Sequence, residues 1–163
     1  MAVTTKKTSD YSSGCFLAKN NDKYYIQDIL KVKLEYPELK KLIIATALED
    51  GPGVVIGFED AGQQMAIISD IRACTELSKY VIKSMRPTKD KITRAYPWAS
   101  QCELGNFIIQ RAPWNRDFFD ECNTFSTESV LKGTSHDDMI DSVTGAYTIR
   151  SDESVLMFTK MRL

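Results

Sequence analysis

Clustered histidine and cysteine residues and long apolar runs are what this sequence lacks. It has one histidine, His136, and four cysteines that lie far apart without a Cys-x-x-Cys pair. A zinc site or a disulfide framework is therefore not expected. No run of about 18 apolar residues occurs, and the N-terminal residues contain no apolar signal segment. We expect a soluble protein of the reducing cytoplasm with no membrane span.

Common nucleotide-binding and hydrolase motifs are absent as well. The chain has no GxxxxGK[ST], no GxGxxG and no GxSxG sequence, so phosphate-loop and serine-hydrolase functions lose their usual support. A catalytic triad on His136 is not expected, because Asp137 and Asp138 adjoin it and favour its charged form. We interpret His136 as a loop or capping residue at the start of a helix.

The composition is that of an ordinary globular domain. The 163 residues are 43% hydrophobic and 26% charged, with a formal net charge of -1. A chain of this length can bury most of its apolar surface in one core, so we expect a single domain over residues 1–163. Because the net charge is close to zero, contact with nucleic acid requires a local basic patch.

Strand and helix patterns alternate along the chain after an initial hairpin, whose turn is Asn20-Asn21-Asp22. The predicted strands are residues 14–18, 24–34, 54–58, 80–85 and 107–109, with a further one in the tail at 154–159. The predicted helices are 38–48, 61–77, 88–105, 113–122 and a last helix that ends near Ile149, preceded by a loop at 125–134. The apolar run 54–58 is expected to be a strand buried on both faces. This order is typical of the α/β class.

The most informative stretch is Ser135-His136-Asp137-Asp138-Met139-Ile140-Asp141, at the start of the last predicted helix. Asp138 and Asp141 are three residues apart, so they project from one helix face and repel each other unless a cation lies between them. A divalent metal site is one explanation. The other is an acidic helix N-terminus, in which Ser135 caps the helix and the aspartates complement its dipole. Taken alone, the cluster slightly favours the acidic helix N-terminus.

A second acidic pair, Glu59-Asp60, follows the predicted strand 54–58. Alone, it is better explained as a solvated strand end. Together with the aspartate cluster, it matches the chemistry of two-metal phosphodiester cleavage. Two Mg²⁺ or Mn²⁺ ions about 4 Å apart need several carboxylate ligands, so that one ion activates water and the other stabilises the leaving oxygen.

Several short segments, in their order and spacing, carry a resemblance to a known family. They are Ala2-Val3-Thr4 with Ser9-Asp10-Tyr11-Ser12, Phe58-Glu59-Asp60-Ala61-Gly62-Gln63, Asp90-Lys91-Ile92-Thr93-Arg94-Ala95, Glu103-Leu104-Gly105-Asn106 and His136-Asp137-Asp138-Met139-Ile140-Asp141. On these segments the chain resembles the C-terminal nuclease domain of the large terminase subunit of tailed phages and prophages. The resemblance covers most of the chain, and implies a ribonuclease H-like α/β fold with a central mixed sheet flanked by helices.

The resemblance also implies a site and a reaction. Glu59 would be the ligand at the end of the central strand, and Asp138 or Asp137 the ligand from the last helix, with Asp138 favoured by spacing. Asp141 is similar in placement to the second helix aspartate of related junction resolvases. The implied cofactors are two Mg²⁺ or Mn²⁺ ions. The implied reaction is metal-dependent endonuclease cutting of concatemeric double-stranded DNA during genome packaging in the host cytoplasm.

The implied partners are double-stranded DNA, the terminase small subunit, the portal protein and the ATPase domain of the parent protein, which this chain does not contain. The family also carries an aspartate on its first strand, shortly before an alanine that corresponds to Ala2, whereas this sequence begins at Met1. We therefore expect a truncated first strand in a piece of a longer protein or in a degenerate prophage copy, with a central place in the sheet unfilled. The alternative function is a catalytically inactive ribonuclease H-like module that binds DNA or a packaging partner.

Basic residues gather between the predicted strand 80–85 and the first turns of the predicted helix 88–105. Lys89, Lys91 and Arg94 follow Lys83 and Arg86 within a short stretch, a pattern suited to a phosphate backbone. An ordinary solvated helix start gives the same pattern. The resemblance favours DNA binding by Lys89, Lys91 and Arg94, because this segment recurs in the family. Trp98 and Trp114 have apolar neighbours at helical spacing, so we expect them to pack in the protein and not to stack on bases.

Overall fold

The computed structural model describes residues 11–60, 64–133 and 136–151. Its elements, in chain order, are β1 (Ser12–Asn20), β2 (Lys23–Val32), α1 (Tyr36–Asp50), β3 (Val55–Glu59), α2 (Gln64–Arg72), the 3₁₀ turn η1 (Thr75–Leu77), β4 (Val81–Met85), α3 (Lys91–Glu103), β5 (Phe107–Ile109), α4 (Asn115–Thr124), α5 (Thr127–Leu131) and α6 (Asp138–Ser151). The expected α/β class and the mixed sheet flanked by helices are confirmed.

The described strands form two sheets. One is a three-stranded mixed sheet in the order β1-β2-β5, in which β1 and β2 are antiparallel and β5 is parallel to β2. Asn21 makes the β1–β2 hairpin possible, because its φ of 53° lies in the left-handed region that asparagine tolerates in turns. The other sheet is the parallel pair β3–β4. Parallel pairing brings the carboxyl ends of β3 and β4, at Glu59 and Met85, to one edge.

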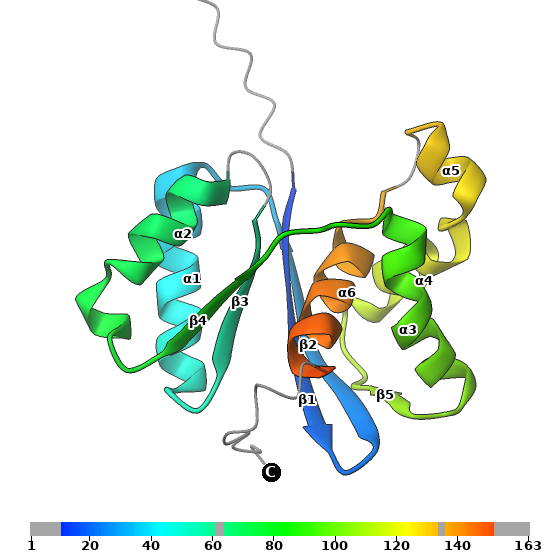
Figure 1. Cartoon of the computed structure of the whole chain (residues 1–163), viewed down its shortest axis with the longest axis horizontal. Coiled ribbons are helices and arrows are strands. Elements are labelled where there is room, and N and C mark those ends of the chain that lie inside the picture. Colours follow the sequence, from blue (N-terminus) through cyan, green and yellow to red (C-terminus); the bar gives the residue numbers. More distant parts are fainter. Residues whose placement is uncertain (1–10, 61–63, 134–135, 152–163) are drawn as a thin grey trace, which may run out of the picture.

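Different helices pack beside each sheet, as Figure 1 shows: α1 and α2 lie beside β3 and β4, while α3 and α4 lie on the other side of the molecule. Two hydrophobic cores follow this division. One gathers residues of α1, α2, η1, β3 and β4 around the fully buried Ile71, and the other gathers residues of β1, β2, β5, α3, α4 and α6 around Ile26, Phe118 and Val143.

Helix α6 joins the two halves, because it contacts β1 and β2 in one sheet and β3 and β4 in the other. Its approach to β3 is so close that a Cβ atom at Gly57 would clash with the Cδ1 atom of Ile149. A glycine in mid-strand is explained here by the close passage of this helix. The first turn of α6 lies toward the end of β3, where Arg94 contacts both Asp141 and Glu59.

Several sequence-based expectations were wrong in detail. The predicted loop 125–134 contains α5, because Ser126 and Ser129 form a reciprocal capping box that starts a helix. The predicted helix 61–77 is divided: α2 ends at Arg72, and η1 follows it. Strand β3 is half-buried and not buried on both faces, since none of its residues is fully buried and Gly57 is exposed. The expected Ser135 cap and the strand at 154–159 lie outside the described residues.

Both tryptophans pack as expected. Trp98 is buried, and its indole Nε1 donates a 2.9 Å hydrogen bond to the hydroxyl of Thr144 on α6. Trp114 packs against the same core and lies edge-on to Phe118. Within the described ranges, no helix combines the length and the apolar character that crossing a bilayer requires.

Candidate functional site

Acidic and basic side chains from three elements meet where α6 begins. Glu59 is the last residue of β3, Lys91 and Arg94 lie in the first turns of α3, and Asp137 and Asp141 lie just before and within the first turn of α6. We call these five residues the carboxylate network. The positions follow from local sequence: Asp90 caps α3 by accepting from the Thr93 backbone N–H at 2.9 Å, which starts the helix at Lys91.

Lys91 occupies the centre of the network. Its Nζ lies 2.7 Å from Oδ1 of Asp137 and 2.7 Å from Oδ2 of Asp141. Burial acts to lower the pKa of Lys91, but the hydrogen bonds to both aspartates outweigh it, so that this pKa lies above its ordinary value. Burial raises the pKa of Asp141, with the hydrogen bond from Lys91 acting in the opposite direction. The ammonium therefore sits where two partly desolvated carboxylates converge.

Arg94 connects the network to the end of β3. Its Nη1 lies 3.0 Å from Oε2 of Glu59, and its Nη2 lies 3.6 Å from Oδ1 of Asp141. The Arg94 side chain is 14% exposed, and its Nε is buried without a hydrogen-bond partner among the described residues. The guanidinium thus holds carboxylates from the two halves of the molecule on one planar group. The three carboxylates and two cations together have a formal charge of -1.

Asp138 belongs to a different ion pair. Lys31 on β2 places its Nζ 3.1 Å from Oδ2 of Asp138 and 2.5 Å from Oε1 of Glu121. Of the four predicted metal ligands, the structure gathers Glu59, Asp137 and Asp141 around Lys91 and Arg94, and directs Asp138 toward β2. This arrangement makes Asp137 and Asp141, four residues apart, the pair that shares Lys91.

Glu121 is a residue that the sequence analysis missed. It is 6% exposed, and its Oε2 accepts hydrogen bonds from the backbone N–H groups of Met139 and Ile140, at 3.0 and 3.4 Å. A glutamate of α4 therefore caps the N-terminus of α6, where a carboxylate also complements the helix dipole. The available signal was its position: it lies three residues after Phe118 on the apolar face of α4, where an unpaired charge is costly.

The predicted DNA-binding residues do not share one environment. Lys89 is exposed in the connection before α3. Lys91 and Arg94 are both engaged by carboxylates of the network. His136 is exposed immediately before Asp137, consistent with the expected loop position.

The network suits a divalent cation in its donor chemistry. Asp137, Asp141 and Glu59 offer the hard oxygen atoms that Mg²⁺ and Mn²⁺ prefer, and the Lys91 ammonium marks a point where two of these side chains already approach one cation. In the described arrangement, however, no group of three or more His, Cys, Asp or Glu side chains is gathered closely enough to hold a metal ion. A bound ion would therefore require these side chains to move from their present partners.

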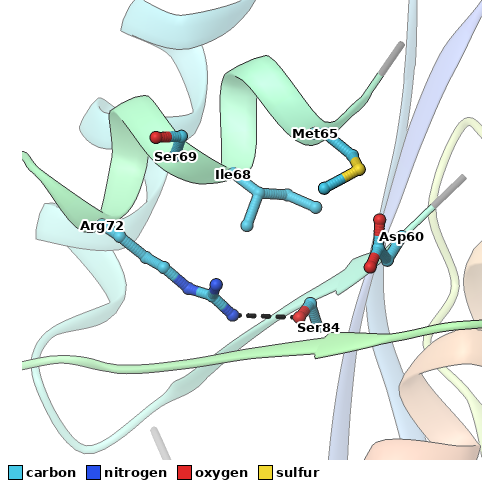
Figure 2. Close-up of a pocket in the computed structure, with 6 residues that line it drawn as sticks. All are labelled: Asp60, Met65, Ile68, Ser69, Arg72 and Ser84. Atoms are coloured by element: carbon cyan, nitrogen blue, oxygen red, sulfur yellow. Dashed lines mark hydrogen bonds between the residues drawn. The ribbon is translucent and has the colours of Figure 1, made fainter. Parts of the chain in front are cut away.

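A small hollow lies on the other side of β3, lined by Asp60, Met65, Ile68, Ser69, Arg72 and Ser84 and about 190 Å³ in volume (Figure 2). Arg72 Nη2 donates to the Ser84 hydroxyl across it at 2.9 Å. Asp60 faces the hollow, and its Oδ1 is buried without a hydrogen-bond partner in the described part of the chain. Asp60 is thus separate from the network that Glu59 joins.

The chain matches a known protein family. Residues 2–148 match the family described as the terminase RNaseH-like domain, and this span includes every residue of the network. The comparison with curated proteins finds no match.

Proposed function

Because the chain belongs to the family of terminase RNaseH-like domains, we propose that it is a metal-dependent endonuclease domain that cuts concatemeric double-stranded DNA during viral genome packaging. One observation carries the proposal. Glu59, Asp137 and Asp141 come from opposite halves of the fold, yet they converge on the shared cations Lys91 and Arg94. Three carboxylates that share two cations beside the end of β3 support a site for positive charge.

The proposed cofactors are two Mg²⁺ or Mn²⁺ ions, which when bound would activate a water molecule and stabilise the leaving oxygen of the phosphodiester. Asp137 and Asp141 would hold an ion from α6, and Glu59 would hold one from the end of β3. Asp138 remains in the proposed ligand set and would reach the site by leaving Lys31. Glu121 fixes the start of α6, so it orients Asp137 and Asp141 without touching the ions.

Substrate binding is proposed for the basic residues beside the network. Lys89 is exposed two residues before Lys91 and is free of the network, so it can contact a phosphate group directly, whereas Lys91 and Arg94 lie three residues apart in the first turns of α3. We also propose that the domain works with an ATPase domain, a small terminase subunit and a portal protein in the host cytoplasm. These partners follow from the family and not from any surface of this chain.

A second candidate function is a catalytically inactive module that binds DNA or a packaging partner. The observation in its favour is that Lys91 and Arg94 largely neutralise the carboxylates, and that the described side chains are not arranged to hold a metal ion. In this case, the network would serve as a structural link between the two halves of the molecule.

Cleavage of supercoiled plasmid in Mn²⁺, in Mg²⁺ and in EDTA tests the two functions. The endonuclease predicts nicked and linear products with metal, none with EDTA, and loss of cleavage in Glu59→Gln and Asp141→Asn. Asp70→Asn is the matched control, because Asp70 pairs with Lys40 and Tyr36 away from the network. If folded protein does not cleave DNA under any of these conditions but still retards it in a gel, the inactive module is correct. Cleavage that persists in Asp141→Asn contradicts the site.

A further inference from the structure

The position between Asp137 and Asp141 is taken by the Lys91 ammonium. Two of its three N–H donors are used at 2.7 Å, one on each aspartate. An ammonium and a divalent ion would compete for the same oxygen atoms, because both are cations that approach carboxylates closely. The two cannot occupy this point together.

Lys91 and Arg94 differ in how readily each could move away from its carboxylate partners. Lys91 is a compact charge on a flexible four-carbon stem, and its side chain is 38% exposed, so it can swing toward solvent. Arg94 is 14% exposed and contacts Glu59 and Asp141 through separate nitrogen atoms of one rigid plane. Of the two cations, Lys91 is the one that can be exchanged, while Arg94 keeps Glu59 near α6.

A phosphate-binding role for Lys91 meets the same obstacle. In the described structure its ammonium is committed to Asp137 and Asp141, and Asp141 is also contacted by Arg94. A DNA phosphate would have to compete with two carboxylates that are already in hydrogen-bond contact. Lys91 becomes available to the DNA backbone only if another cation replaces it.

We propose that Lys91 is a placeholder cation, whose ammonium occupies the Asp137–Asp141 position in the metal-free protein and is displaced when a divalent ion binds. The inference deepens the proposed function and rests on it, because it assumes that these aspartates bind metal. Displacement would free Lys91 for the phosphate backbone, so that metal binding and DNA binding strengthen each other.

Mn²⁺ binding measured by calorimetry tests the exchange without relying on activity. Wild type is compared with Lys91→Gln, with Asp141→Asn and with Lys40→Gln, a control that removes an ammonium held by Asp70 at 2.8 Å outside the network. Removing the placeholder removes a competitor that makes two charge-assisted contacts, so Lys91→Gln should bind Mn²⁺ at least about tenfold more tightly. Lys40→Gln should bind as wild type does.

The wild-type protein offers a second measurement, in case Lys91→Gln fails to fold. Lysine acetylation by a water-soluble active ester, mapped by mass spectrometry, reports how accessible each ammonium is. Adding Mn²⁺ should increase modification of Lys91 several-fold and leave Lys40 unchanged. Unchanged or reduced modification of Lys91 in saturating Mn²⁺ would overturn the proposal.

The outcomes separate the inference from the proposed function. If wild type binds Mn²⁺, Asp141→Asn does not, and Lys91→Gln binds no more tightly than wild type, the metal site is correct and the placeholder role is wrong. If folded wild type and Lys91→Gln both fail to bind Mn²⁺, the metal-dependent function and the placeholder role are both wrong.

Discussion

The buried cap of α6 gives the sharpest stability prediction. Glu121 is 6% exposed, and its carboxylate accepts hydrogen bonds from the backbone N–H groups of Met139 and Ile140. Replacing Glu121 by alanine removes this acceptor. It also removes the partner that Lys31 contacts at 2.5 Å, while Asp138 remains at 3.1 Å. Loss of one member of a buried ion pair typically costs about 3–5 kcal/mol. The remaining Asp138 contact places our expectation near the lower end, about 3 kcal/mol.

Glutamine at the same position separates the contribution of the helix cap from that of the ion pair with Lys31. Glu121→Gln keeps a carbonyl oxygen for the backbone N–H groups but loses the negative charge that faces Lys31. We expect a loss of about 1–2 kcal/mol, since only the charge-assisted part of the contact is removed. The order of stability should therefore be wild type, Glu121→Gln, then Glu121→Ala.

Urea unfolding followed by circular dichroism measures both values. Glu128→Ala is the matched control, because Glu128 is 76% exposed and pairs with Lys132 one turn away, so its loss should change stability by no more than about 0.5 kcal/mol. A loss below about 1 kcal/mol for Glu121→Ala, with an unchanged denaturant slope, would refute the reasoning that this carboxylate holds the start of α6.

Three further predictions concern packing and reactivity. Gly57→Ala should destabilise the protein by about 1–2 kcal/mol, because its Cβ meets Cδ1 of Ile149, and Ile149→Val should recover most of this loss in the double variant, as a thermal-unfolding cycle would show. Trp98→Phe should lose about 1–3 kcal/mol in urea unfolding, since it leaves the buried hydroxyl of Thr144 without its 2.9 Å donor; an unchanged midpoint would contradict this. Burial raises the pKa of Cys122 to about 11, so iodoacetamide should alkylate it slowly at pH 8 and about tenfold faster for each unit up to that pKa, whereas a rate that levels off by pH 9 would be inconsistent.

Much of the local structure was predictable because neighbouring residues determine it. Turn residues at Asn20-Asn21-Asp22 predicted the hairpin, and an apolar run ending at Glu59 predicted β3 with an acidic side chain at its end. The fold class and the family were also predictable, since both depend on the order of segments along the chain. The capping box at Ser126 and Ser129 was a local signal that went unrecognised.

The composition of the acidic site was less predictable from spacing. Asp138 and Asp141 are separated by three residues, and Asp137 and Asp141 by four. Both separations place two side chains on one face of a helix, so the helical period cannot choose between them. The choice depends on what faces the helix: Lys91 lies opposite Asp137 and Asp141, and Lys31 opposite Asp138.

The sequence by itself determined the class of fold, the family, and the presence of carboxylates at the end of one strand and the start of one helix. These depend on local propensity and on the order of motifs. Only the tertiary structure decided that Arg94 joins Glu59 to Asp141, that Lys91 lies between two aspartates, and that Glu121 caps α6. Each of these contacts joins segments far apart in the chain, and their geometry exists only after α3, α4 and α6 have packed together.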